Sequence, residues 1–454
     1  MVSYVVILLL LITCLMILKY KNNPQICLSL FLIGSTCFNN DLSLGPLHTT
    51  FLFELVLLIC FLQNFTKYKK HNYFSFPFNG TLILFIVSIL LVGLFDDRHT
   101  FSSSFINPFK YFVNTFSTLI CAYCIGYDSK KNVEFKKTLV LLLIVEFAFG
   151  LFEMVFKFSP ISIITAMVTG DHSTMVLNLE SNYGRFRIGS IQNMSFNYGY
   201  VSAIFGLVLL HYVSLSQKVN AKIVVFALIT GAGGVIMSGS RSALLACVLS
   251  YFFLFVTCFN PGKILKIGLF AIPVILVVLS YTGGVFNDFF DSFIDGVTTG
   301  GKNSVGSSSS MRYDQWMAVL RYFSKAPIFG YGINYFVEVL GWGTDSYINT
   351  DLWGLEGLHY SVLLEQGIVG AIAHICLFGS IIIYFLSHRK KDSKEAYFGL
   401  SLMILFLSWA FLTGALGAWP FTMMFVALAI VNIKKKVHEK NDKTKRISNS
   451  YTGL

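Results

Sequence analysis

Arg241 is the residue of this sequence best placed to bind an anion at the edge of a membrane. It follows Ser238-Gly239-Ser240 and opens the apolar run 243–255. An Arg at membrane depth costs roughly 2.5–3.5 kcal/mol on insertion scales, so its presence there indicates a functional site. The free N–H groups of a helix N-terminus would add to the positive field. The alternative is an interfacial Arg that snorkels to water.

Arg185 and Arg187 form a second cationic candidate, just before the apolar run that begins near Met194. A guanidinium stays charged and pairs with phosphate oxygens through two hydrogen bonds. Two such groups beside Arg241 would therefore suit a diphosphate. The alternative is weak surface pairing with the neighbouring acids Glu180 or Asp171.

His359 is the candidate general base, because it stands at the start of the apolar run 360–386. An imidazole can exchange a proton near neutral pH, so it could take the proton of a sugar hydroxyl. Glu365 lies six residues later, off the same helix face, and is not an obvious orienting partner. A lone interfacial His without a chemical role is the alternative.

Composition indicates that membrane helices position these residues. Hydrophobic residues make up 55% and charged residues 13% of the chain, against about 25% charged residues in soluble domains. The net charge of +11 does not indicate nucleic-acid binding, because the basic residues lie in short links and in the tail 434–446. That distribution follows the positive-inside rule.

We expect an all-α polytopic protein with about 12–13 transmembrane helices. The predicted spans are 2–18, 25–40, 49–65, 80–96, 105–127, 137–157, 194–216, 222–238, 241–258, 264–281, 358–386, 396–413 and 416–433. The spans divide the chain into N-terminal helices (1–157), an external loop (158–193), central helices (194–281), a long external loop (282–357), C-terminal helices (358–433) and a basic cytoplasmic tail (434–454). In this count the basic links fall on one side, which the positive-inside rule assigns to the cytoplasm.

The long loop contains one segment with helical periodicity, 311–323, in which Trp316, Met317 and Leu320 recur on one face. We expect an amphipathic helix against the membrane face that ends near Pro327. Gly330-Tyr331-Gly332 then predicts a tight turn.

Other residue patterns give weaker indications. Cys121 and Cys124 form a C-x-x-C inside an apolar run, where Cys more often acts as a small hydrophobe. Glu146 and Glu153 lie seven apart within a predicted span, and structural pairing is favoured over an ion pathway. No motif for nucleotide binding is present, which argues against an ATP-driven pump.

Four ordered stretches of the sequence resemble the bacterial O-antigen polymerase and O-antigen ligase family. They are the segment 185–193, Ser238-Gly-Ser-Arg-Ser-Ala-Leu-Leu-Ala246, Arg312-x-x-x-Trp316 followed by Pro327-Ile-Phe-Gly-Tyr-Gly-Ile333, and His359 with Glu365-Gln-Gly-Ile-Val-Gly370. The resemblance covers roughly residues 183–386 and implies a membrane glycosyltransferase of the C-type helical class.

The resemblance also implies the roles of the candidate residues. Its donor would be an undecaprenyl-diphosphate-linked oligosaccharide, with the diphosphate held by Arg241 and one of Arg185 or Arg187. His359 would deprotonate the acceptor hydroxyl, with inversion at the anomeric carbon. No metal and no cofactor would be required, because arginines supply the charge stabilisation. The loop residues that we expect to contact the substrate are Arg312, Trp316 and Arg321.

The resemblance leaves two enzymatic alternatives. Ligases usually carry Asn after the loop histidine, whereas Tyr360 follows here, so we favour an O-antigen polymerase. It would act on the periplasmic face of the bacterial inner membrane, with a chain-length regulator and a flippase as membrane partners. The alternative is a ligase that transfers the glycan to lipid A–core. A polysaccharide transporter or flippase is more distant, because no internal repeat is visible.

Overall fold

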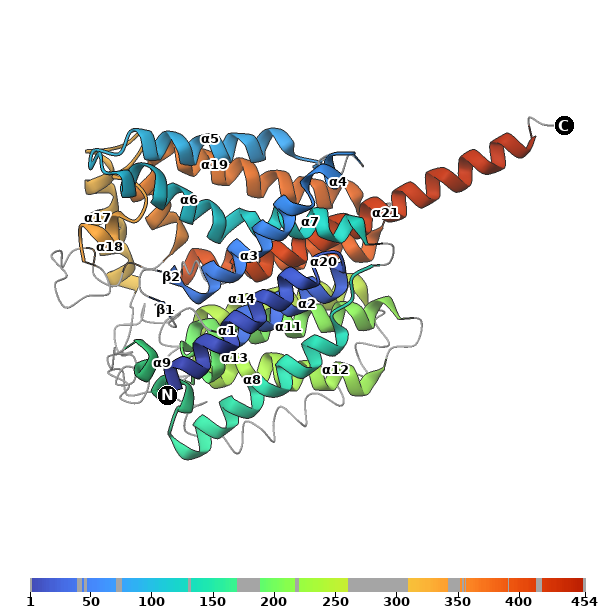
Figure 1. Ribbon diagram of the computed structural model, residues 1–454, viewed down its shortest axis with the longest axis horizontal. Helices are drawn as coiled ribbons and strands as arrows, with labels where there is room; N and C mark the ends of the chain where they lie inside the picture. Colours follow the sequence, from blue (N-terminus) through green and yellow to red (C-terminus); the bar gives the residue numbers. More distant parts are fainter. Residues whose placement is uncertain are drawn as a thin grey trace.

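The computed structural model is an assembly of long helices that run side by side (Figure 1). It describes residues 2–38, 43–44, 47–70, 76–129, 132–169, 188–216, 220–259, 309–341, 352, 355, 357–390, 392–413 and 419–451. A helix is found at every predicted span except 264–281, which lies outside the described residues, as do Arg185 and Arg187.

The N-terminal part consists of successive helices and one two-stranded hairpin. The elements are α1 (Val2–Lys19), α2 (Pro24–Cys37), β1 (Ser43–Leu44), β2 (Leu47–His48), α3 (Thr49–Gln63), α4 (Phe65–Lys70), α5 (Asn79–Leu94), η1 (Ser102–Ile106), α6 (Asn107–Phe112), η2 (Val113–Ser117), α7 (Thr118–Asp128), α8 (Lys136–Phe156) and α9 (Pro160–Thr169). The segments η1 to α7 follow one another without a gap and form one helix with two π turns.

The rest of the described chain is helical. Its elements are η3 (Ser190–Gln192), α11 (Ser195–Leu215), α12 (Ala221–Ala227), η4 (Leu228–Ala232), α13 (Gly233–Ser238), α14 (Arg241–Cys258), α17 (Ser309–Phe323), α18 (Tyr335–Glu338), α19 (Leu358–His388), α20 (Ser393–Thr413) and α21 (Trp419–Tyr451). Helix α21 continues through the predicted basic tail and projects from the body of the protein (Figure 1).

The helices have the length and composition of membrane spans. Within the described residues, 6 helices are long and apolar enough to cross a membrane, and α1, α2, α3 and α5 are apolar but shorter. Large apolar side chains point outward, as with Ile375, which is 71% exposed, and Phe252, which is 69% exposed. The chain is therefore an all-α polytopic membrane protein, as the sequence predicts.

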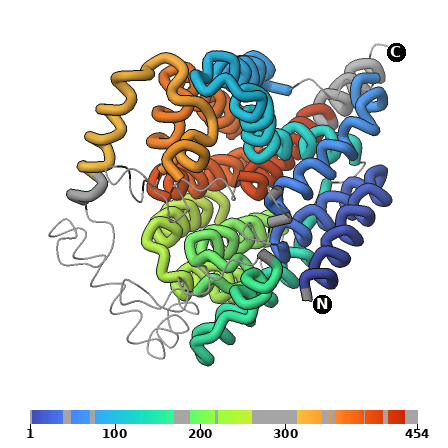
Figure 2. Tube along the Cα trace, turned by 60° about the vertical axis from the view of Figure 1, so that its left-hand side comes forward, coloured from blue at the N-terminus to red at the C-terminus, as the bar shows by residue number. Residues whose placement is uncertain are grey.

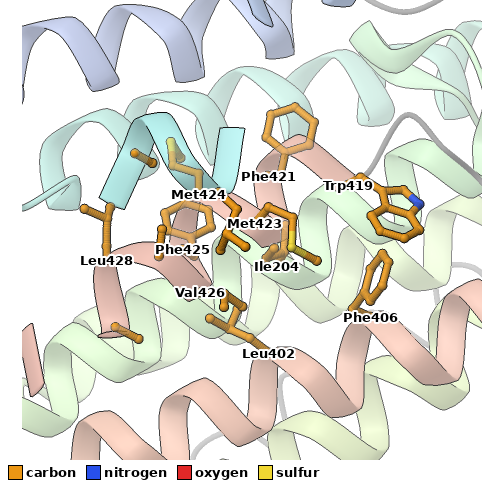
Figure 3. Packing of buried hydrophobic residues seen from close by; sticks show 14 of the residues in the cluster. Ile204, Leu402, Phe406, Trp419, Phe421, Met423, Met424, Phe425, Val426 and Leu428 are labelled. Carbon is orange, nitrogen blue, oxygen red and sulfur yellow. The ribbon is translucent and has the colours of Figure 1, made fainter. Parts of the chain in front are cut away.

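Helix α11 forms the centre of the assembly, with 89% of its span buried. It packs against α8, α13, α14 and α20. Figure 2 shows the green to yellow-green helices α11, α13 and α14 beside the orange and red C-terminal helices. Aromatic rings fill the contact with α20 and α21, since Tyr200 stacks on Trp409 at 4.1 Å between ring centroids. Trp419 meets Phe406 at 4.8 Å, edge to face (Figure 3).

The basic links gather at one end of the assembly, here called the basic end. Lys67 pairs with Asp128 at 2.5 Å, and Lys436 pairs with Asp392 at 2.6 Å. Lys435 donates to the carbonyl of Gly126, at the end of α7. The opposite end, here called the outer end, carries the N-termini of α14 and α19, the C-terminus of α20, and α17 and α18 (Figure 1).

Helix α19 is broken at Gly367, whose φ of 60° and ψ of −158° are not helical. The segment 327–332 completes the interrupted hydrogen bonds. The amides of Ile368 and Val369 donate to the carbonyls of Pro327 and Ile328, at 2.9 and 3.2 Å. In the reverse direction, the amides of Tyr331 and Gly332 donate to the α19 carbonyls of Leu364 and Glu365, at 2.8 and 2.9 Å. Non-helical backbone inside a membrane protein requires such internal partners.

Gly330 permits this docking, and replacing it tests the arrangement. Its φ is +69°, and a Cβ there would lie 2.5 Å from the backbone of Glu365. We expect Gly330→Ala to destabilise the protein by roughly 1–3 kcal/mol, the range for enforced backbone strain, measured as a lower unfolding temperature in detergent. Gly379→Ala is the control, because a Cβ at Gly379 meets nothing within 4 Å. Equal unfolding temperatures for the two variants would contradict the docking.

Candidate functional site

Arg241 is the first residue of α14, as the sequence predicts. The preceding helix α13 ends at Ser238 and is capped by Gly239, whose left-handed φ of 63° reverses the chain at little steric cost. The amide of Ser240 donates to the buried Ser238 hydroxyl at 3.2 Å, which holds the turn. The Arg241 side chain is half-buried at the outer end. It therefore stands beside the positive end of the α14 dipole.

The last turn of α20 connects Arg241 to His359. Ser242, the neighbour of Arg241, accepts a hydrogen bond from Thr413 at 2.5 Å. Two residues earlier on α20, the Phe411 ring stacks on the His359 imidazole, with 4.1 Å between centroids and 13° between planes. The structure thus places Ser242, next to Arg241, and the His359 ring against one turn of α20.

Aromatic rings surround His359, the second residue of α19. Besides Phe411, the Tyr360 ring lies 3.9 Å from it and the Trp316 ring 6.3 Å, centroid to centroid. Gly357 begins the helix with φ of 110°, and its Cα faces the imidazole closely enough that a Cβ would lie 2.9 Å from His359 Cε1. These contacts restrict the ring to a narrow range of orientations.

Helix α17 covers the start of α19, which explains how the long loop contributes to the site. Ala318 and Val319 are buried in one cluster with Tyr360 and Leu364. Trp316 lies on the same side, 6.0 Å from the Tyr360 ring. Of the three predicted loop residues, Trp316 is therefore beside His359. Arg321 is exposed in the last turn of α17, and the Arg312 side chain lies outside the described part.

The segment after Arg187 is anchored near the Arg241 turn. Ile188 is buried against Met237, four residues before Arg241, and against Tyr198. The Glu153 carboxylate accepts hydrogen bonds from the amides of Gly189 and Ser190, both at 3.0 Å. The following bonds complete this network: Gln192 Nε2 to Glu146 Oε1 at 2.7 Å, and Ser159 Oγ to Glu153 Oε1 at 2.6 Å. Hydrogen bonds thus hold both oxygens of Glu153 and one oxygen of Glu146, whereas Glu146 Oε2 has no hydrogen-bond partner among the described residues.

A partly buried ionic cluster around Arg98 was not singled out in the sequence. Its guanidinium pairs with Asp96 at 2.6 Å and Glu338 at 2.7 Å, and donates to the Ile333 carbonyl at 2.7 Å. Burial alone would lower the pKa of Arg98, but Asp96 and then Glu338 raise it above its usual value. The cluster ties the turn after α5 to α18, next to the segment that docks in the α19 break. The charged triplet Asp96-Asp97-Arg98 after an apolar run was the available signal.

Removing one partner tests how much this cluster contributes to the stability of the protein. Arg98→Ala would leave the Asp96 side chain, which is 0% exposed, without its cation. We expect a loss of about 3 kcal/mol in stability, as for other broken buried pairs, measured by thermal unfolding. The double variant Asp96→Asn/Arg98→Ala should recover part of that loss. A double variant less stable than Arg98→Ala would contradict the pairing.

The described residues offer few candidates for a metal site or a nucleophile. No group of three or more His, Cys, Asp or Glu side chains lies close enough there to hold a metal ion. Cys121 and Cys124 are buried in α7 and are not joined in a disulfide.

Fold and geometry define a polytopic helical membrane protein whose outer end holds an arginine turn and an aromatic-enclosed histidine. A family model described as O-antigen ligase matches residues 225–375, which include Arg241, Trp316 and His359. The match confirms the resemblance to the O-antigen ligase and polymerase family and implies a membrane glycosyltransferase-like enzyme. A protein of Haemophilus influenzae, described as uncharacterized, is 22% identical over 368 residues, covering 77% of this chain and 88% of its own.

Proposed function

We propose that this protein is an O-antigen polymerase, or a polymerase of a related surface polysaccharide. It would transfer a glycan from undecaprenyl diphosphate to a hydroxyl of another lipid-linked repeat unit. The observation that carries the proposal is that the start of α14, which bears Arg241, and the start of α19, which bears His359, both contact the last turn of α20, through Ser242 and through the His359 ring. A cation and a base at one end of the protein are the groups that transfer from a diphosphate requires.

The proposed reaction uses each group once. The acceptor hydroxyl attacks the anomeric carbon with inversion while its proton passes to His359. The bond from that carbon to the diphosphate oxygen breaks, and undecaprenyl diphosphate leaves with its added negative charge. Arg241, with one of Arg185 or Arg187, stabilises that charge in place of a metal. The anchoring of Ile188 beside Met237 supports this assignment of the second arginine.

The residue after His359 supports a polymerase over a ligase. Tyr360 is 6% exposed and packs beneath α17, so this position offers an aromatic ring where ligases usually carry Asn. A ligase acting on lipid A–core remains the second candidate, because it uses the same donor. The family match gives no support to a transporter or flippase.

The proposal includes an orientation in the cell. The lysines of the basic end would face the cytoplasm by the positive-inside rule. Arg241 and His359 would then face the periplasm from the inner membrane of a bacterium. A flippase that delivers lipid-linked units and a chain-length regulator would be membrane partners of this activity.

Surface polysaccharide from a strain lacking the gene tests the function. A lost polymerase leaves a single repeat unit on the core in gels, whereas a lost ligase leaves no glycan on the core and accumulates lipid-linked polymer. We expect the first pattern. An unchanged long-chain ladder in the deletion strain would contradict both enzyme assignments.

A further inference from the structure

A cavity of about 740 Å³ opens at the basic end, far along the helices from Arg241 and His359. The N-terminus of α5, the end of α7, the last turns of α19 and the basic part of α21 surround it. Its volume falls in the range of about 300–1,000 Å³ typical of small-molecule sites. The transfer chemistry proposed above makes no use of it.

The described lining of this cavity carries the cation of Lys434 and no acidic residue. The imidazoles of His388 and His438 also line it. Lys434 is held in place because its Nζ donates to the Tyr123 hydroxyl at 2.8 Å and lies 5.4 Å from that ring. The nearby acids are already paired, Asp128 with Lys67 and Asp392 with Lys436. The charge therefore favours an anion.

The hydroxyl of Tyr384 is a separate sign of a ligand. The residue lines the cavity and is only 8% exposed, yet its hydroxyl has no hydrogen-bond partner among the described residues. Its ring is fixed by the His388 imidazole at 4.2 Å between centroids. A buried tyrosine hydroxyl ordinarily finds a partner. An anionic oxygen in the cavity would accept a hydrogen bond from it.

The start of α5 adds backbone donors to the same space. Phe78 occupies the N-cap position and has no side-chain acceptor for the first amides of the helix. Gly80, in the first turn, faces open space, since a Cβ there would meet nothing within 4 Å. Amides of a first helical turn beside Lys434 form a favourable phosphate site.

The flank of the cavity is apolar and outward-facing. Ile383, which lines it, is 66% exposed, and Ile83 and Val87 on α5 are 60% and 42% exposed. Since α5 and α19 pack side by side, these side chains form one outer face that begins at the cavity. The site therefore suits an amphiphile whose head is anionic and whose tails follow the helices.

We propose that this cavity binds the phosphate headgroup of an anionic membrane phospholipid, with its acyl chains along the α5–α19 face. Lys434 supplies the charge, and Tyr384 with the first-turn amides of α5 supplies the hydrogen bonds. Cationic pockets between membrane helices bind lipid headgroups in this way.

Native mass spectrometry of the purified full-length protein tests the site. The probes are phosphatidylglycerol and phosphatidylcholine with matched acyl chains. The wild-type protein should retain phosphatidylglycerol at least about fivefold better, the effect of one cation near a headgroup. Lys434→Gln and Gly80→Phe should each abolish this preference, the first by removing charge and the second by filling open space. Equal retention of the two lipids by the wild-type protein would overturn the proposal.

Two control variants test whether the preference for phosphatidylglycerol arises at this cavity. Gly379→Phe adds the same bulk at a position equally open but outside the cavity lining, and Lys69→Gln removes an exposed charge in α4. Both should keep the wild-type preference. A preference that survives in Lys434→Gln and Gly80→Phe, or inorganic phosphate that competes as well as the lipid, would contradict a headgroup site here.

Discussion

Replacing Arg241 with Ala is expected to reduce polymer formation by about 100- to 1,000-fold, as when one electrostatic donor is removed from a transition state. The leaving diphosphate gains negative charge in the proposed reaction. Arg241, at the N-terminus of α14, would stabilise that charge, and Ala would not. A purified assay with lipid-linked repeat units measures the rate. The rate of Arg241→Lys should lie between those of the wild type and Arg241→Ala, because an ammonium keeps the positive charge but cannot form two parallel hydrogen bonds to the phosphate.

The control for Arg241 is an arginine at the other end of the assembly. Arg389 is exposed at the end of α19, so Arg389→Ala changes the net charge equally without touching the outer end. It should polymerise at the wild-type rate. Long-chain ladders of normal intensity from cells carrying only Arg241→Ala would remove the diphosphate role.

Replacing His359 with Ala is expected to reduce the rate of transfer by about 100- to 10,000-fold, the usual contribution of a general base. The donor should still bind, because the ring contacts of His359 are with Phe411, Tyr360 and Trp316. The loss should therefore appear in kcat, with little change in KM for the donor. Single-turnover rates with a bound lipid-linked donor measure it directly.

A second histidine of the outer end controls for this substitution. His99 is exposed in the turn after α5 and has a positive φ of 49°, which Asn tolerates. His99→Asn should transfer at the wild-type rate. Undiminished single-turnover transfer by His359→Ala would exclude it as the base.

The helices could be predicted from the sequence because each apolar run is local. The starts of α14 and α19 fall at Arg241 and Leu358, beside the residues expected to open them. The turn at Gly330 was also predicted, since it rests on residues adjacent in the chain. Contacts between distant segments could not be predicted in this way. No local pattern indicates that Phe411 stacks on His359 or that Trp316 lies above it.

The break in α19 shows the same limit. Glu365-Gln-Gly-Ile-Val-Gly370 lies within an apolar run that predicts a continuous span, and Gly is tolerated in membrane helices. The interruption exists because segment 327–332 supplies acceptors and donors at that level. The Arg98 cluster was missed for a related reason, since its partner Glu338 lies 240 residues away.

The interrupted helix also sets an order of events during synthesis. The ribosome makes residues 327–332 before Gly367, since a chain is produced from its N-terminus. The groups that complete the ladder of α19 are therefore already present when Ile368 and Val369 reach the bilayer. The amides exposed by the break can therefore form hydrogen bonds with a segment that has already been synthesised.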